Sequence, residues 1–326
     1  MKNNKRIIFY LLLIGAVLCV FAVGRMGVKE RSVTAYSFDT VCDITAYTAS
    51  DKPLANAVKI LEKYDKMWSA ENEDSEIFKL NNGENVSLSN ETSDIIAYAE
   101  SFEHDDLFNI YIDSLVKAWD IKNNQGNIPD VSKALADMHN KKGINLGGVA
   151  KGYVCDKIAE EMKKDGVSSA LINLGGNVYA LGKKPTGEEW RIGIADPKNP
   201  DNIIGSIRGE NLSVVTSGDY QRYFEKDGVR YHHIFNPKTG FPANSEIRSA
   251  TIIGESSALC DVLSTMVFVA GVEEGAKLLK EYNVGGIIVT DDTVYFSKNI
   301  EYIFKQSTFS STSIRYWFFI LNDLRY

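Results

Sequence analysis

Two segments that lie more than a hundred residues apart carry residue types suited to shared chemistry. Residues 145–152 read NLGGVAKG, a glycine-rich turn that opens a helix and places Lys151 in its first turn. Such a turn presents backbone N–H groups to an anion. Residues 261–265 read DVLST, which puts Asp261 and Thr265 four positions apart on one helix face. Hard oxygen ligands beside a phosphate cradle predict Mg²⁺ and a phosphate ester, and hence an enzyme that acts on a nucleotide.

Each of these features has a second interpretation. The glycine turn could be a tight strand-to-helix connection that binds nothing, with Lys151 in solvent and Gly147 and Gly148 chosen only for their backbone freedom. Asp261 stands in an otherwise apolar helical segment, where an unpaired buried charge is costly. A bound cation would compensate that charge, and a hydrogen bond to a neighbouring strand is the alternative.

A third motif, HHIFNPKTGFP at residues 232–242, contains two of the four histidines. We expect His232 and His233 on one strand with their side chains on opposite faces, followed by a turn at NPKTG. A histidine at a strand end can carry a proton near neutral pH, and a hydrogen-bonded structural histidine is the alternative. His104 and His139 lie in polar stretches and are predicted on the surface.

Composition narrows the class of protein. The chain has 326 residues, which allows one large or two ordinary domains, and 44% hydrophobic with 24% charged residues is typical of a globular protein. A net charge of −7 with no basic block beyond the N-terminus argues against a nucleic-acid partner. The four cysteines form no CxxC pair, which argues against zinc, and Cys155 and Cys260 are expected in the core.

The N-terminus predicts a membrane segment. Lys2, Lys5 and Arg6 precede the uncharged run 7–24, so residues 1–24 read as a signal or anchor that leaves the remainder outside the cytoplasm. Three fates stay open: an uncleaved anchor, a lipoprotein modified at Cys19, and simple cleavage. We expect the protein at the extracytoplasmic face of the cell membrane, with residues 25–32 as a linker.

The remaining periodicities predict an α+β fold with a helix-rich first part and a strand-rich second part. Residues 33–304 are assigned to one catalytic domain and 305–326 to a C-terminal appendage outside it. Beyond a first strand at 33–48 that is interrupted at 38–40, the expected helices are 53–68, 75–80, 89–102, 111–119, 148–164, 258–269 and 272–282. The expected strands are 170–180, 190–195, 203–207, 212–216, 248–254, 284–290 and 294–296.

These motifs, in this order, resemble the FAD:protein FMN transferase family, the ApbE-like flavin transferases. The resemblance covers roughly residues 33–304 and includes DSEIFKLN at 74–81, LFNI at 107–110, NLGGVAKGYVCDK at 145–157, NLGGN at 173–177, TSGDYQRYF at 216–224, HHIFNPKTGFP and DVLST. It implies a T-fold-related catalytic domain that is Mg²⁺-dependent and usually exported. Such enzymes split FAD, attach FMN through a phosphoester to a threonine or serine of an acceptor flavoprotein, and release AMP.

The resemblance also implies roles for individual residues. The metal would be bound by the carbonyl of Gly148 and the side chains of Asp261 and Thr265, and Lys151 would hold the FAD phosphates. FAD contacts would come from Phe38, Leu107, Phe108, Asn109, Asn145 and Phe235. Several of these positions depart from the family pattern, which commonly has aspartate at 109 and 145 and Met-Gly-Thr at 38–40, so we expect altered FAD affinity.

The predicted reaction is an in-line displacement at the FMN-side phosphorus of FAD, in which Mg²⁺ and Lys151 neutralise the diphosphate and AMP leaves. Either Asp261 or His233 would take the proton of the acceptor hydroxyl. One alternative is FAD hydrolysis to FMN and AMP. The other is an extracytoplasmic flavin-binding protein without turnover, which the intact pair of Asp261 and Thr265 disfavours.

Overall fold

The computed structural model describes residues 27–124, 126–300, 303–306 and 313–316. The predicted anchor at 1–24, including Cys19, lies outside these ranges and stays a prediction. Within the described ranges, no helix combines the length and the apolar character that crossing a bilayer requires.

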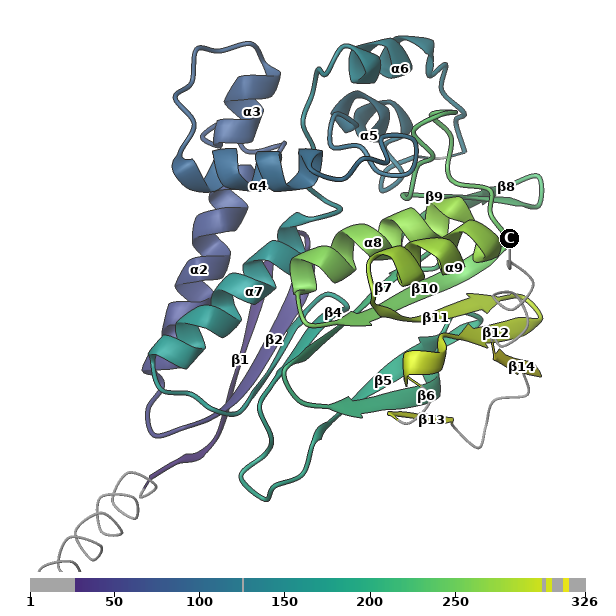
Figure 1. Ribbon diagram of the computed structural model, residues 1–326. Coiled ribbons are helices and arrows are strands. Elements are labelled where there is room, and N and C mark those ends of the chain that lie inside the picture. Colours follow the sequence, from purple (N-terminus) through teal and green to yellow (C-terminus); the bar gives the residue numbers. More distant parts are fainter. Residues whose placement is uncertain (1–26, 125, 301–302, 307–312, 317–326) are drawn as a thin grey trace, which may run out of the picture.

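A nine-stranded sheet forms the centre of the molecule (Figure 1). All neighbouring strands pair antiparallel except the last two, which are parallel. In spatial order the strands are β1 (Lys29–Ser37), β2 (Thr40–Thr48), β3 (Ala170–Leu174), β4 (Asn177–Leu181), β7 (Leu212–Gly218), β10 (Ile247–Gly254), β11 (Gly285–Thr290), β12 (Thr293–Phe296) and β14 (Ser313–Tyr316).

Helices cover one face of this sheet and a smaller sheet covers part of the other. The helices are α2 (Lys52–Trp68), α7 (Ala150–Lys164), α8 (Ser257–Ala270) and α9 (Val272–Glu281), and the small sheet has the order β13 (Phe304–Gln306), β6 (Asn199–Gly209), β5 (Trp190–Asp196). Strand β10 lies between the two layers: Ile252 faces the helices and Ile253 faces the small sheet. Residues 249–253 of β10 are all buried, so this strand shows no alternation of buried and exposed positions.

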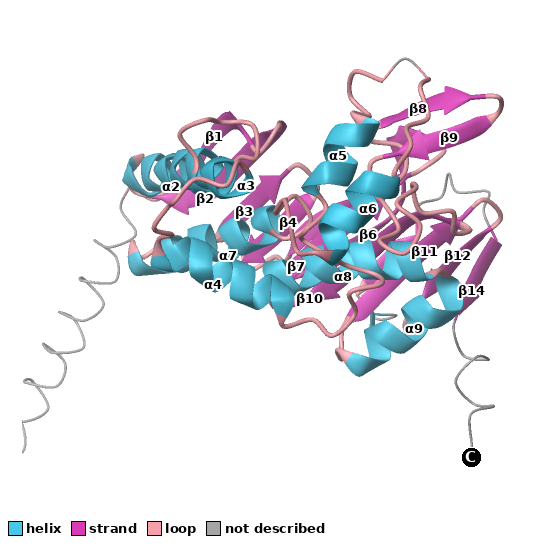
Figure 2. Cartoon of the chain, turned by 90° about the horizontal axis from the view of Figure 1, so that it is seen from above, coloured by secondary structure: helices cyan, strands magenta, loops and turns pink. Residues whose placement is uncertain are grey.

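Four short helices and a two-stranded hairpin gather beyond one end of the central sheet (Figures 1 and 2). They are α3 (Glu76–Asn81), α4 (Asn90–Glu100), α5 (Asp113–Trp119), α6 (Ser132–His139), β8 (Tyr223–Lys226) and β9 (Val229–His232). Helices α5 and α6 and the hairpin share a core around the buried ring of Trp119, whose indole N–H donates to the carbonyl of Gly240 at 2.8 Å. Helices α3 and α4 instead contribute Ile77 and Ile95 to the main core. In Figure 1 this assembly lies above α7 and α8, on the side of the sheet that the helices cover.

The structure departs from the sequence predictions at several boundaries. β1 begins at Lys29, inside the predicted linker 25–32. β13 pairs with β6 and β14 pairs with β12, so these parts of the predicted appendage belong to the two sheets. His233 lies beyond the end of β9 and not on the strand, and α6 was not predicted. A three-residue 3₁₀ turn, η1 (Lys298–Ile300), follows β12.

Candidate active site

The two motifs that are far apart in sequence meet where α7 crosses α8. The carboxylate of Asp261 is buried, and its Oδ2 accepts the backbone N–H of Gly152 at 2.9 Å. A Cβ atom added at Gly152 would lie 2.3 Å from the carbonyl oxygen of Ser257 and 2.7 Å from Cβ of Asp261. Only glycine therefore lets the two helices approach this closely. From the sequence, one alternative was a hydrogen bond between Asp261 and a neighbouring strand. In the structure the hydrogen bond is made to the first turn of α7 instead.

This contact changes the hydrogen bonding of the glycine turn. In a regular helix the N–H of Gly152 would donate to the carbonyl of Gly148, four residues earlier. That N–H is used by Asp261, and within the described residues no donor reaches the carbonyl oxygen of Gly148. The hydroxyl of Thr265, one turn beyond Asp261 and partly exposed, also has no partner in the same ranges. The structure thus leaves two neutral oxygens available near a buried carboxylate.

Not every amide of the turn is free to bind an anion. The N–H groups of Val149 and Ala150 both donate to the carbonyl of Leu146, and that of Gly147 donates to Oδ1 of Asn145 at 3.0 Å. In the described chain the amides of Gly148 and Lys151 have no acceptor. The ammonium of Lys151 lies over the turn and donates to the carbonyl of Gly147 at 3.1 Å. An anion at this turn would meet two amides and one lysine.

The predicted contact segment 107–109 packs directly against the turn. A Cβ atom at Gly148 would lie 2.9 Å from Cε2 of Phe108, which is itself buried. Asn145 links the turn to Asp113. Its Oδ1 accepts the N–H of Gly147, and its Nδ2 lies 3.4 Å from Oδ1 of the buried Asp113. Asp113 in turn pairs with Lys117 at 2.7 Å. Asn145 and Phe108 thus lie beside Gly148, and their contacts with FAD stay predictions.

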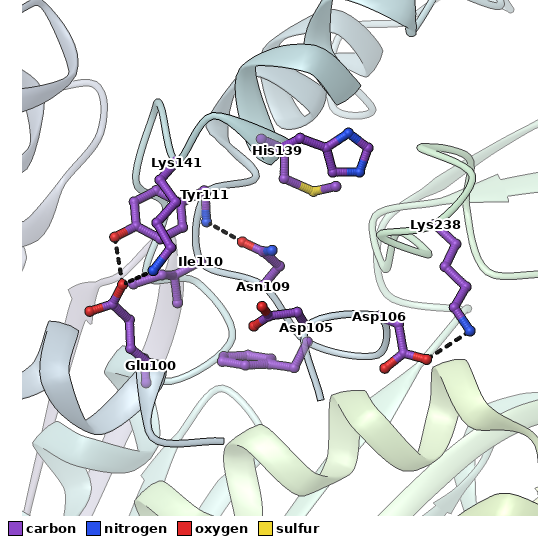
Figure 3. A pocket seen from close by; sticks show the side chains of 12 residues that line it. Glu100, Asp105, Asp106, Asn109, Ile110, Tyr111, His139, Lys141 and Lys238 are labelled. Atoms are coloured by element: carbon purple, nitrogen blue, oxygen red, sulfur yellow. Dashed lines mark hydrogen bonds and ion pairs between the residues drawn. The ribbon is translucent and has the colours of Figure 1, made fainter. Parts of the chain in front are cut away.

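A cavity of about 340 Å³ opens next to this segment (Figure 3). Its charged groups are largely paired with one another: Lys141 binds Glu100 at 2.8 Å, and Lys238 binds Asp106 at 2.7 Å. Burial and the hydrogen bond to Glu100 raise the pKa of Tyr111 to about 12, so its hydroxyl stays protonated. Sequence reasoning missed these charged groups, whereas His139, which was predicted on the surface, is exposed and lines the cavity.

The two histidines differ in their surroundings. His232 is buried, its Nε2 lies 3.0 Å from the carbonyl of Ala243, and its Nδ1 accepts the N–H of Ile234 at 3.2 Å. Burial lowers the pKa of His232 to about 4, so it is a neutral structural residue. Nδ1 of His233 lies 3.3 Å from the carbonyl of Arg222, which makes Nδ1 the protonated nitrogen and leaves the Nε2 lone pair available.

Burial and the neighbouring Arg222 also lower the pKa of His233, to about 3, and Lys151 adds to this effect. A neutral imidazole of such low basicity takes a proton only when negative charge is bound beside it.

Arg222 connects His233 to the tip of the β1–β2 hairpin, a role that sequence reasoning did not find. Its guanidinium donates to the carbonyl of Asp39 at 2.9 Å and pairs with the Asp39 carboxylate at 3.1 Å. Phe38 and Asp39 both adopt positive φ, 51° and 57°, a conformation that non-glycine residues adopt at a cost. The contact with Arg222 holds this unusual turn, and with it Phe38, in place.

Phe235, the last predicted contact residue, lies elsewhere in the assembly. Its ring is buried and stacks on Trp119 with ring centroids 6.1 Å apart. A flavin contact of Phe235 stays a prediction.

Comparison with known proteins identifies the family of this chain. The model of the ApbE family matches residues 38–288. The chain is similar to a FAD:protein FMN transferase of Klebsiella pneumoniae (33% identity, 74% of this chain and 83% of that protein) and to one of Treponema pallidum (31% identity, 82% and 88%). A crystal structure of an ApbE protein from Thermotoga maritima superimposes with a TM-score of 0.75 at 27% identity, covering 85% of this chain and all of that one. From its matched residues, its relatives and its fold, the chain belongs to the ApbE family.

Proposed function

We propose that this ApbE-like flavin transferase moves FMN from FAD to a serine or threonine hydroxyl of an acceptor flavoprotein, with Mg²⁺ as cofactor and AMP as leaving product. The names of its relatives support FAD and a protein acceptor. The observation that carries the proposal is the bond between Asp261 and Gly152, because it joins the two motifs and frees the carbonyl of Gly148.

The available oxygens fit a magnesium ion. Asp261, Thr265 and the carbonyl of Gly148 offer one carboxylate, one hydroxyl and one carbonyl, all hard ligands, and Mg²⁺ prefers few protein ligands together with phosphate oxygens and waters. The described residues contain no cluster of three or more His, Cys, Asp or Glu that would favour a transition metal. A bound Mg²⁺ would neutralise charge that develops on the diphosphate.

The protein's own groups would do the rest. Lys151 and the free amides of Gly148 and Lys151 would hold the diphosphate, and Phe108 would fix the turn against the substrate. Of the two candidate bases, His233 has an uncommitted Nε2, while one oxygen of Asp261 is already bound to Gly152. The negative charge of FAD would raise the low pKa of His233.

The decisive experiment removes the carboxylate. We expect Asp261→Ala to abolish Mg²⁺-dependent FMN attachment, measured as the mass gain of an acceptor domain after incubation with FAD and Mg²⁺. Asp292→Ala, at an exposed turn between β11 and β12, should label the acceptor at the wild-type rate. Full labelling by Asp261→Ala would refute the metal assignment. AMP and free FMN formed equally well without an acceptor would show the hydrolase reaction instead.

The location follows from the N-terminal sequence. The basic flank and the uncharged run 7–24 support an enzyme held at the outer face of the cell membrane, as an anchored protein or as a lipoprotein. Fractionation of cells that express the full chain, followed by the mass of the mature N-terminus, tests this. A soluble cytoplasmic product with an intact N-terminus would overturn it.

A further inference from the structure

Helices α7 and α8 are joined by a second carboxylate that the reaction scheme does not use. Asp156 lies on α7, one turn beyond Gly152. Its Oδ1 accepts the N–H of Ser257 at 2.8 Å, and its Oδ2 accepts the N–H of Ala258 at 3.0 Å and the hydroxyl of Ser256 at 2.9 Å. These donors form the N-terminus of α8, so Asp156 caps a helix to which it does not belong.

The arrangement is reciprocal. Asp156 of α7 binds N–H groups in the first turn of α8, and Asp261 of α8 binds an N–H group in the first turn of α7. Each carboxylate thus faces the positive end of the partner helix. Between the two bonds the helices touch at Gly152, where the carbonyl of Ser257 leaves no room for a side chain. The two carboxylates therefore fix both the separation and the register of the two helices.

This register decides where Asp261 lies relative to the glycine turn. Gly148 lies two residues before the start of α7, and Asp261 is one turn beyond the residues that Asp156 binds. A slide of α8 along α7 would carry the carboxylate away from Gly148 without changing either helix internally.

We propose that Asp156 is a positioning residue that holds Asp261 and Thr265 in register with the carbonyl of Gly148, and so sets the affinity for the divalent cation. This inference rests on the proposed function. Asp156 itself touches neither substrate nor metal in this scheme. Its effect should appear in metal affinity, because groups that orient ligands typically alter it by about 10–100-fold when they are changed.

The test is Asp156→Asn, which keeps the shape but turns an amide N–H₂ group toward backbone donors. We expect the Mg²⁺ concentration for half-maximal AMP release at saturating FAD to rise about tenfold, with most of the rate recovered at high Mg²⁺. Binding of Mn²⁺ to the protein alone, followed by the electron paramagnetic resonance signal of free Mn²⁺, should weaken by a similar factor. This second readout does not depend on turnover.

Glu246→Gln is the matched control. Oε1 of Glu246 accepts the N–H of Val272 at 3.0 Å at the start of α9, so this variant also removes a carboxylate from a helix N-terminus. It should lower the melting temperature as Asp156→Asn does and leave Mg²⁺ and Mn²⁺ affinity unchanged. Equal metal affinity in the two variants would overturn the positioning role.

If Asp156→Asn does not fold, Ser256→Ala decides, since it removes one of the three bonds to Asp156. It should weaken metal affinity in the same direction but less, whereas Ser89→Ala, which removes the N-cap of α4, should not. An unchanged affinity in Ser256→Ala would overturn the inference. The same measurement separates the metal site from the positioning role. If Asp261→Ala binds Mn²⁺ like the wild type, the proposed metal site is wrong. If only the Asp156 and Ser256 variants bind Mn²⁺ like the wild type, the positioning role is wrong and the metal site is unaffected.

Discussion

At the scale of single residues, the neighbourhood of Lys151 explains how the glycine turn would discriminate a diphosphate. Its ammonium lies over the turn, and only two amides there lack an acceptor within the described residues. We expect Lys151→Gln to raise KM for FAD about tenfold to a hundredfold, because a hydrogen bond to a charged group is worth about 1.5–3 kcal/mol. Steady-state kinetics of AMP release measures this. A KM equal to that of the wild type would remove Lys151 from the binding site.

His232 gives a prediction for acid stability. Its pKa is about 4 in the folded protein and about 6.5 in an unfolded chain. The unfolded state therefore binds more protons below about pH 6.5, so the stabilisation from neutral His232 is complete above that pH and is lost as the pH falls toward 4. In this window the free energy of unfolding should fall by about 1.4 kcal/mol per pH unit from this residue alone. Urea titrations at pH 7 and pH 5 should show a smaller loss in His232→Gln, and an identical loss would contradict the assignment.

The proton-accepting role of His233 needs a separate measurement. We expect His233→Gln to fold normally and bind FAD, but to lose most of the rate of FMN transfer and the acidic limb of the pH–rate profile, because the Nε2 lone pair is then absent. A variant with the same acidic limb as the wild type would assign the base to Asp261. The comparison is made at saturating FAD and Mg²⁺, so that it reports the transfer step.

The sequence singles out the motifs of Asp261 and Lys151, which meet in the structure, but not the contacts that support them. Asp261 was recognised because a carboxylate in an apolar helix demands a partner, and Lys151 because it follows a glycine turn. Asp156 and Arg222 gave no such signal. Their partners lie on other elements, 100 and 183 residues away in the chain, and only the tertiary structure brings them together.

At the scale of elements, the crossing of α7 and α8 is the most constrained contact near the site. We expect Gly152→Ala to destabilise the protein by about 1–3 kcal/mol, since the added methyl group would meet the backbone of Ser257 and the side chain of Asp261. Metal affinity should fall with stability, because the same displacement moves Asp261. Thermal denaturation with and without Mg²⁺ measures both effects. A variant with the wild-type melting temperature would show that the helices can separate freely.

Helices with a clear helical spacing of apolar residues were predicted well. Elements whose ends are set by contacts with other elements were not. Helices α2, α7 and α8 agree with their predicted spans to within about two residues at most ends. The short helix α6 was missed because its eight residues carry few apolar positions, and it is held mainly by the core around Trp119. Likewise, His233 was placed on a strand because no local signal marks where pairing between β8 and β9 stops.

At the scale of the whole molecule, the candidate site and the C-terminal strands lie in different parts of the structure. The candidate site lies on the helix-covered face, at the contact of α7 and α8, whereas β12 and β14 form one edge of the central sheet and the small sheet packs on its other face. We expect truncation after residue 306, which removes β14, to lower the melting temperature but leave FMN transfer unchanged. Truncation after residue 300 also removes Phe304, which packs on Phe296, and should destabilise further. If the protein truncated after residue 306 remains folded but loses FMN transfer, the C-terminal strands contribute to activity and the prediction is wrong.

The α+β class was predictable from the order of helical and strand periods, but the division into two sheets was not. Strands β5, β6 and β7 follow one another with similar apolar patterns, and yet β7 joins the central sheet while β5 and β6 form the smaller one. Which strands pair depends on which strand edges are still unpaired when the sheets and helices pack together. A single sequence does not contain this information.

The place of β2 in the sheet has a consequence for biogenesis. Its neighbour β3 begins at Ala170, after helices α2 to α7 in the chain. The hairpin of β1 and β2 therefore leaves the ribosome long before β3, its later partner, has been made. Contacts so distant along the chain form late and slowly. The outer edge of β2 therefore stays without its partner until β3 is made, and the contact of Asp261 with Gly152 cannot form before α8 has been synthesised.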